Sequence, residues 1–279
     1  MKSLFSSLKR DSRMKQGPSG TVEMLLLIVV LCCTSAMSAQ DLSGYEIMER
    51  ALSGSAWDDM QAQLSLILEN SRGDIRERTI AFYSRENAAE ESRMLMRFKA
   101  PADVEGTGFL MIEHQDGEDE RYLYLPALRR VKRVASSGSG GNFMSSDFTY
   151  YDIGSPELED WRYTVLKDTT LDSEACYTLK CLPKTDQIRQ DTGYSKILRW
   201  ITKRGFNTIR SEYYDESGQK KKILTIPEFT ELQGVDFASK LIMKDIQINH
   251  ISIMQFNNIK LDTDIPEDFF SQRYLQRGQ

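Results

Sequence analysis

An acidic run that follows one of the two histidines is the first candidate for chemistry. His114 begins the segment HQDGEDE, in which Asp116, Glu118, Asp119 and Glu120 add oxygen ligands next to an imidazole nitrogen. Such a set could bind a metal ion. Calcium loops, however, need a defined alternation of ligands and a distal bidentate carboxylate, and this segment has neither. We therefore predict a solvated turn and no metal site.

The second histidine, His250, is the remaining candidate for acid–base catalysis. It lies in the strand-like segment QINHISI, so we expect its side chain in the core or at the rim of a sheet. No serine has the strand-to-helix setting of a nucleophile elbow. Because no acid, base and nucleophile converge, we predict that the protein is not an enzyme and has no cofactor.

The two cysteines of the segment CYTLKC could be free or bridged. In a continuous strand, the Cα atoms of Cys176 and Cys181 lie about 16 Å apart and on opposite faces, whereas a disulfide needs less than about 7 Å. A bridge therefore requires a tight bend, which an oxidising compartment would permit. Both alternatives stay open, and two thiols without a histidine cluster predict no metal site.

Residues 1–39 have the three-part form of a secretory signal. Basic residues precede an apolar run at 24–33 (MLLLIVVLCC), and small residues follow it. The run is too short to span a bilayer as a permanent helix. We expect cleavage after Ser38 or Ala39, which leaves an exported, periplasmic domain at 40–279. An uncleaved anchor and lipidation of a cysteine in the run are the alternatives.

Charge excludes one class of partner. Removing residues 1–39 takes away five positive and two negative charges, so the formal net charge changes from −5 to −8. The phosphates of a nucleic acid would repel such a protein overall, so we predict no nucleic-acid binding.

The elements that must position these residues follow from periodicity. Ser43 and Glu46 form a capping-box pattern, and Tyr45, Met48 and Leu52 recur at helical spacing, which predicts a short amphipathic helix. Beyond it the period changes to two, typical of half-buried strands. Strands are predicted at 60–68, 79–83, 93–98, 107–113, 120–125, 161–168, 175–182, 196–203, 208–214, 221–227, 238–245 and 246–256, and a late helix at 266–275. This pattern predicts a mainly β fold with α: a single, strongly curved antiparallel sheet without a domain boundary.

A basic strand is predicted after the strand at 120–125. In LPALRRVKRV, Arg129, Val131 and Arg133 fall on one face and Arg130 and Lys132 on the other. Charges on both faces cannot all be buried unpaired, so the strand is expected at an edge or at the rim of an opening. It could bind lipid phosphates or an acidic partner, or its charge could protect an edge strand against aggregation.

The segment 135–148 (ASSGSGGNFMSSDF) is too flexible to hold a rigid catalytic geometry. It could form a lid whose Phe143, Met144 and Phe148 enter an apolar mouth, or an ordinary surface loop. A phosphate-binding loop needs defined glycine spacing and a helix directly after it. No such helix is expected after this segment, so a nucleotide site is not predicted.

Methionines recur on the apolar positions of neighbouring predicted strands, at Met60, Met94, Met96 and Met111. Methionine makes adaptable apolar surfaces, although a core role alone would explain these positions. A curved sheet of this length has more apolar inner face than two short helices cover, which leaves room for a cavity.

Three blocks of sequence resemble the outer-membrane lipoprotein-sorting protein family, exported bacterial proteins similar in fold to the carrier LolA and its receptor LolB. The blocks are MRFKAPADVEGTGFL, ERYLYLPALRRVKRVASS and FMSSDFTYYDI, and the closing IPEDFF fits the same fold's C-terminus. The resemblance implies an incomplete antiparallel β-barrel whose concave apolar face is closed by helices and binds acyl chains. Such proteins are often associated with RND-type exporters.

The leading prediction is a monomeric periplasmic carrier or chaperone for the acyl chains of lipoproteins or lipids. The predicted cavity lining is Tyr45, Met48, Leu64, Leu66, Met94, Met96, Phe98, Phe109 and Met111. The predicted rim or lid is Arg130, Lys132, Phe143, Met144 and Phe148. The alternative is an accessory interaction module of an RND-type exporter, with no transported ligand of its own, that docks through residues 129–133.

Overall fold

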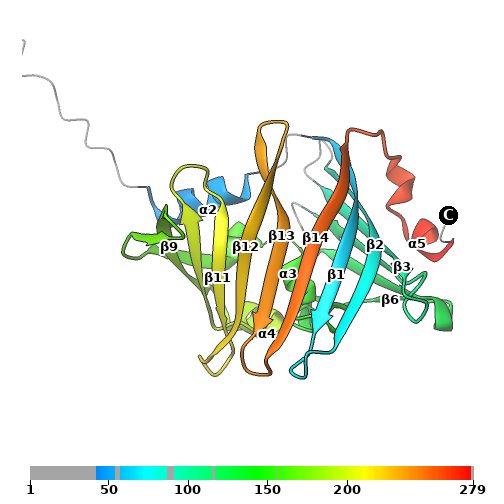
Figure 1. The fold of residues 1–279 in the computed structure, drawn as a ribbon, viewed down its shortest axis with the longest axis horizontal. Coiled ribbons are helices and arrows are strands. Elements are labelled where there is room, and N and C mark those ends of the chain that lie inside the picture. The colour runs from blue at the N-terminus through cyan, green and yellow to red at the C-terminus, as the bar shows by residue number, and fades with distance from the viewer. Residues whose placement is uncertain (1–41, 54–56, 87–90, 115–116, 155, 278–279) are drawn as a thin grey trace, which may run out of the picture. The chain divides into compact units, whose positions relative to one another are not determined.

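The computed structural model describes residues 42–53, 57–86, 91–114, 117–154 and 156–277. The predicted signal segment lies outside the described residues and stays a prediction. Within them, 14 strands form one antiparallel sheet that is not closed, accompanied by short helices (Figure 1). The predicted fold class, a mainly β protein with a single curved sheet, is confirmed.

The order of strands in the sheet is β6-β5-β4-β3-β2-β1-β14-β13-β12-β11-β10-β9-β7, and β8 pairs with β9. Their bounds are β1 Asp59–Glu69, β2 Ile75–Glu86, β3 Ser92–Ala100, β4 Gly108–Glu113, β5 Glu120–Leu125, β6 Arg130–Arg133, β7 Trp161–Val165, β8 Thr169–Leu171, β9 Glu174–Pro183, β10 Lys196–Thr202, β11 Thr208–Tyr214, β12 Lys220–Leu232, β13 Val235–Asp245 and β14 His250–Leu261.

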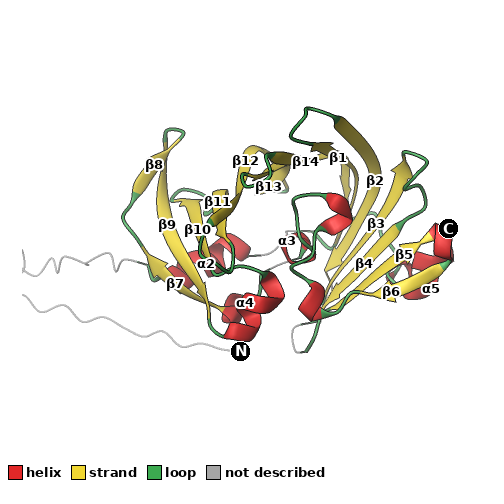
Figure 2. Ribbon diagram, turned by 90° about the horizontal axis from the view of Figure 1, so that it is seen from below, coloured by secondary structure: helices red, strands yellow, loops and turns green. Residues whose placement is uncertain are grey.

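Pairing of the first strand with the last one divides the sheet into two arms. β1 and β14 pair antiparallel, with Leu64 opposite Phe256 and Leu66 opposite Met254. The sheet bends into an arch, with β2 to β6 in one arm and β7 to β11 in the other, and the short helix α3 (Tyr150–Ile153) lies between the arms (Figure 2). The basic strand β6 ends one arm, which confirms the predicted edge position.

The two faces of the sheet carry separate apolar clusters, as period-two alternation requires. On β3, Met94, Met96 and Phe98 belong to the large cluster of the concave face. Leu95 belongs to a smaller cluster on the convex face, together with Phe270 and other residues near the C-terminus. Burying one such side chain fully contributes about 1.5–3 kcal/mol, so the concave cluster dominates stability.

The predicted early helix is present as α2 (Gly44–Leu52). The Ser43 hydroxyl accepts from the Glu46 amide at 3.2 Å, and the Glu46 carboxylate accepts from the Ser43 amide at 2.8 Å. The helix packs against β7, where a Cβ on Gly44 would lie only 2.9 Å from the Cβ of Tyr163. Glycine at this position therefore permits the close contact.

The predicted late helix forms in two pieces on the convex face. A turn of 3-10 helix, η5 (Glu267–Phe269), precedes α5 (Gln272–Arg277), because the Ser271 hydroxyl accepts from the Tyr274 amide at 3.2 Å and begins a new helix. Leu275 and Phe270 pack on Leu110. This helix covers the side of the sheet opposite the methionine-rich face.

Some predicted boundaries were wrong. The strand predicted at 246–256 begins only at His250, because Asp245 Oδ1 accepts from the Gln247 amide at 3.0 Å and holds a turn. The helix α4 (Asp186–Thr192), the strand β8 and the single helical turn α3 were not predicted. Cys176 and Cys181 are both free and buried on the extended strand β9.

Candidate functional site

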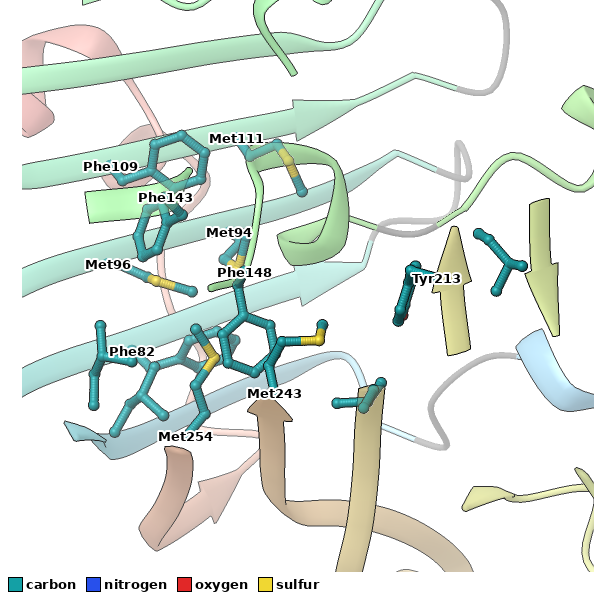
Figure 3. Close-up of a cluster of buried hydrophobic side chains, with 14 of the residues drawn as sticks. Phe82, Met94, Met96, Phe109, Met111, Phe143, Phe148, Tyr213, Met243 and Met254 are labelled. Carbon is teal, nitrogen blue, oxygen red and sulfur yellow. The ribbon is translucent and has the colours of Figure 1, made fainter. Parts of the chain in front are cut away.

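The concave face of one arm brings together most of the predicted lining residues. The strands β1, β3 and β4 present a continuous apolar surface, completed by Met243 of β13 and Met254 of β14 (Figure 3). The buried members that the sequence predicted are Leu64, Leu66, Met94, Met96, Phe98, Phe109 and Met111. Met48, also predicted and buried, lies on α2, which packs against β7 in the other arm. Methionine side chains are unbranched and polarizable, so this surface can adapt to apolar groups of different shape.

Residues 142–153, which we name the plug, cover this surface. Phe143 is 0% exposed, and its ring centroid lies 5.2 Å from that of Phe109. Phe148 is 2% exposed and lies beside Met243 and Met254 (Figure 3). The structure thus places Phe143 and Phe148 in the apolar face, whereas Met144 is only partly buried.

The plug has its own internal structure. The Phe143 amide donates to the Phe148 carbonyl at 2.7 Å, and the Ser146 hydroxyl donates to the Phe143 carbonyl at 2.6 Å. Met144 and Ser145 have φ values of 47° and 60°, which are unfavourable for residues with a Cβ. Such a conformation persists only where surrounding contacts fix it, and often at functional sites.

The glycine-rich residues before the plug are attached to α4. The Ser139 hydroxyl donates to the Asp191 carbonyl at 2.7 Å, and the Tyr151 amide donates to the Ser139 carbonyl at 2.9 Å. A Cβ on Gly140 would lie 3.1 Å from the Asp191 carbonyl oxygen, so glycine permits this approach. Hydrogen bonds and close packing at Ser139 and Gly140 therefore hold this segment against α4.

A buried ion pair holds the plug to the sheet. Lys222 Nζ donates to the Asp147 carbonyl at 2.7 Å and to Asp152 Oδ2 at 3.2 Å. The side chains of Lys222 and Asp152 are 1% and 3% exposed. Tyr194 donates to the same Asp152 oxygen at 2.7 Å. Because burying two charges is expensive, this pair specifies one position of the plug more than it adds net stability.

A second polar group contacts the plug at Asp147. Its Oδ2 lies 2.7 Å from His250 Nδ1 and accepts from the Ser252 hydroxyl at 2.7 Å, while the Asp147 amide donates to the Ser252 hydroxyl at 2.8 Å. Arg78 donates to the Met144 carbonyl. His250 lies at the rim of the face, in agreement with the prediction. We name the sheet residues that contact the plug the clasp: Arg78, Lys222, His250 and Ser252.

Comparison with known proteins places the chain in a family. A family model described as "Uncharacterized protein" matches residues 90–277. The chain is similar to the outer membrane lipoprotein-sorting protein domain from Vibrio parahaemolyticus, with 31% identity, a TM-score of 0.78, and coverage of 84% of this chain and 98% of that one. The chain belongs to the outer-membrane lipoprotein-sorting protein family.

More distant structures share the fold of this family member. A DUF1329 family protein from Desulfovibrio piger is 23% identical with a TM-score of 0.77, covering 83% of this chain and 97% of that one. A LolA superfamily protein from Nitrosomonas europaea is 19% identical with a TM-score of 0.66, covering 84% of this chain and 99% of that one. These two likenesses show the LolA-like fold alone. None of the curated proteins compared matches the chain.

The predicted rim residues of this lipoprotein-sorting family member lie at two places. Arg130 and Lys132 are exposed on the free edge strand β6. Lys132 pairs with Leu123, a residue that packs against the concave cluster, so both cations project toward that side. Tyr45, which the sequence predicted as cavity lining and not as rim, is 40% exposed on α2 and contacts Tyr163 edge-to-face. Whether these residues touch a ligand stays a prediction.

The candidate ligands of the hairpin tip form ion pairs where the structure describes them, and Asp116 lies outside the described residues. His114 Nδ1 lies 3.3 Å from Glu91 Oε1, and His114 Nε2 lies 3.3 Å from Glu120 Oε1. Arg121 pairs with Asp119 at 2.7 Å. Across the part of the chain that the structure describes, no group of histidine, cysteine and acidic residues has the arrangement of a metal site. In the same residues, no helix combines the length and apolar character needed to cross a bilayer.

Sequence reasoning missed the charged residues inside the arch. Lys222 precedes Leu224 by two positions, and Arg199 lies between Ile197 and Ile201, so alternation already predicts that both cations share the apolar face. Alternation in the sequence could therefore have identified both cations. Asp147 and its contacts had no comparable signal, because they depend on where the plug inserts.

Proposed function

We propose that this protein is a periplasmic carrier or chaperone that binds acyl chains of lipoproteins or lipids on its concave face without catalysis. The observation that carries the proposal is that a separate segment, the plug, covers a methionine-rich apolar face with Phe143 and Phe148. A face that accepts these two rings can accept a hydrocarbon chain in their place. Membership of the lipoprotein-sorting family and the LolA-like fold support a carrier role.

Exchange between plug and ligand would keep the affinity moderate. Each CH₂ group buried contributes about 0.8 kcal/mol, but a chain that displaces Phe143 and Phe148 gains only the difference between its own burial and theirs. The clasp contacts to Asp147 and Asp152 would break at the same time. A carrier that must release its ligand benefits from such a small net gain.

Two further predicted features fit this role. A cleaved signal at residues 1–39 would deliver the protein to the periplasm, where lipoproteins pass between membranes. Arg130 and Lys132, on the concave side of the free edge, would contact the charged surface from which a lipid enters or leaves. Both features remain part of the proposal.

The direct test is the ligand content of the exported protein. Native mass spectrometry and lipid extraction of protein purified from the periplasm should detect a bound acyl lipid, and delipidated protein should bind a fluorescent fatty acid. Consistently empty protein that also fails to bind the fatty acid would sink the proposal.

A variant pair separates a ligand face from a filled core. Phe143→Ala removes a plug ring from the concave face, and Phe270→Ala removes a ring of similar burial from the convex face. If the plug competes with ligand, only Phe143→Ala should tighten fatty-acid binding. If the concave face is only a core, both variants should lose stability and neither should gain binding.

A second candidate function follows from the occupied state of this face. Because Phe143 and Phe148 fill the surface, the protein could instead act as an accessory interaction module of an RND-type exporter and dock through the exposed edge strand β6. Replacing Arg130 and Lys132 by glutamate should then abolish co-purification with a membrane transporter and leave fatty-acid binding unchanged.

A further inference from the structure

Arg199 is a cation in the middle of an apolar surface. It lies on β10, and its neighbours on the same face, Ile197 and Ile201, are almost fully buried. Across the pairs of β10 with β9 and β11, Arg199 lies opposite Leu179 and Ser211, which are 0% exposed. Arg199 as a whole residue is partly exposed. It therefore lies within the concave face without being sealed from solvent.

Arg199 has no acidic partner among the described residues. Its Nη1 donates to the Ser211 hydroxyl at 3.3 Å, and the thiol of Cys181 on β9 is a further polar neighbour. The plug carboxylate of Asp152 is engaged by Lys222 and Tyr194. Every other buried cation of the concave face described above contacts a plug carbonyl or carboxylate, and Arg199 contacts neither.

The groups around Arg199 carry no negative charge at neutral pH. Burial raises the pKa of the Cys181 thiol to about 11. Burial likewise raises the pKa of Tyr151, Tyr163 and Tyr213 above the usual range of tyrosine. A buried charge without a countercharge is costly, so the site is electrostatically incomplete.

We propose that Arg199 binds the anionic headgroup, a carboxylate or phosphate, of the amphiphile whose chain lies on the methionine-rich surface. The guanidinium is planar and binds such groups through two parallel hydrogen bonds. The Tyr151 hydroxyl accepts from Trp161 Nε1 at 2.9 Å and keeps its own proton as a second donor nearby. This inference rests on the proposed function and names the chemical class of its ligand.

The site selects by charge. An amphiphile with an uncharged head leaves Arg199 without a countercharge and gains only from burial of its chain. Because a hydrogen bond to a charged group is worth about tenfold to a hundredfold in affinity, the headgroup decides which of two equally long chains is bound.

Calorimetry with dodecanoate and dodecanol tests this selection at neutral pH. The wild-type protein should bind dodecanoate at least about tenfold more tightly. Arg199→Met should bind both ligands equally, and Arg199→Lys, which keeps the charge without the fork, should retain part of the preference. Arg210→Met is the matched control, because Arg210 projects from the opposite face of the sheet and pairs with Glu212; it should keep the full preference.

The outcomes separate the headgroup site from the carrier function. If wild-type protein binds neither ligand, the carrier function fails and the headgroup site with it. If wild-type protein binds both ligands equally, the carrier function stands and the assignment of Arg199 is overturned. That outcome is read from wild-type protein alone and does not depend on the folding of any variant.

Two further arms identify the source of any preference. A variant with Arg130 and Lys132 both changed to alanine should keep the preference for dodecanoate; its loss would place the headgroup at the β6 edge and overturn the proposal. Inorganic phosphate alone should bind weakly. Binding of phosphate that requires Arg199 and is as tight as that of dodecanoate would assign the site to a free anion.

Discussion

The two arms of the arch handle charge differently on the same concave face. In the arm of β2 to β6 and the adjoining β1, methionine and phenylalanine dominate, and the plug supplies apolar cover. In the arm of β9 to β11, tyrosines surround Arg199. One sheet therefore offers an apolar surface at one end and a cationic site at the other, which suits a ligand with a hydrocarbon chain and a charged head.

The plug explains why Lys222 and Arg199, two cations of the concave face, differ in their partners. Lys222 lies under the plug, where its Nζ donates to Asp152 and to the Asp147 carbonyl. Arg199 lies farther along the sheet, and its neighbours there, the Ser211 hydroxyl and the Cys181 thiol, are neutral. A short inserted segment thus supplies polar partners to one part of the concave face and not to the other.

The largest expected effect comes from breaking the plug's ion pair. Lys222→Met leaves Asp152 buried and uncompensated, so the free energy of unfolding should fall by about 3–5 kcal/mol in urea titrations. Lys221→Met, on the other face of β12, is the control. Adding Asp152→Leu to Lys222→Met should recover most of the loss. A loss below about 1 kcal/mol in the single variant would show that the plug is not held by this pair.

The pH dependence of stability above pH 9 should report on the arm of β7 to β11, which contains Cys181 and Arg199. The pKa of Cys181, raised by burial to about 11 in the folded state, exceeds the ordinary value of 9.0. Between these values the folded state binds more protons than the unfolded state, so stability falls as pH rises from about 9 through about 11. The loss from this thiol approaches about 3 kcal/mol, because each pH unit between the two values corresponds to about 1.4 kcal/mol.

Replacing that thiol should reduce the alkaline loss. Urea titrations of Cys181→Ala at several pH values should give a flatter curve than the wild-type protein. Cys176→Ala, on the other face of the same strand, should change the curve less. Equal curves for wild-type protein and Cys181→Ala would contradict the buried, neutral environment assigned to the neighbours of Arg199.

Two buried serines compare the arms directly. Ser252 exchanges two short hydrogen bonds with Asp147, whereas the contact of Ser211 with Arg199 is longer, at 3.3 Å. Ser252→Ala should therefore cost about 1–3 kcal/mol and Ser211→Ala about 1 kcal/mol or less. Thermal or urea unfolding measures both, and a larger cost for Ser211→Ala would mean that Arg199 is held tightly by its own arm.

The smallest effect on stability is expected at the free edge. Arg130→Glu and Arg133→Glu are exposed changes on opposite faces of β6 and should each alter unfolding by about 0.5 kcal/mol or less. Only Arg130→Glu, on the concave side, should weaken binding to vesicles that contain anionic lipid. Equal weakening by both would assign the effect to general charge.

Local sequence carried much of the fold. The capping box of Ser43 and Glu46 predicted α2, and alternation predicted which residues of β1, β3 and β4 face the concave side. The late helix was harder, because Ser271 begins a new helix within an apolar pattern that looks continuous. The turn before His250 was missed because it depends on one carboxylate, that of Asp245, capping two amides.

By itself, the sequence determined the strands, their inward faces, the basic edge and the family resemblance, because side-chain alternation and capping depend on residues a few positions apart. Only the tertiary structure decided that β1 pairs with β14, that the plug enters the arch, and that Asp152 meets Lys222, while Arg199 has no acidic partner among the described residues. Those contacts join segments far apart in the chain, so their geometry depends on packing of the whole sheet, which no local pattern encodes.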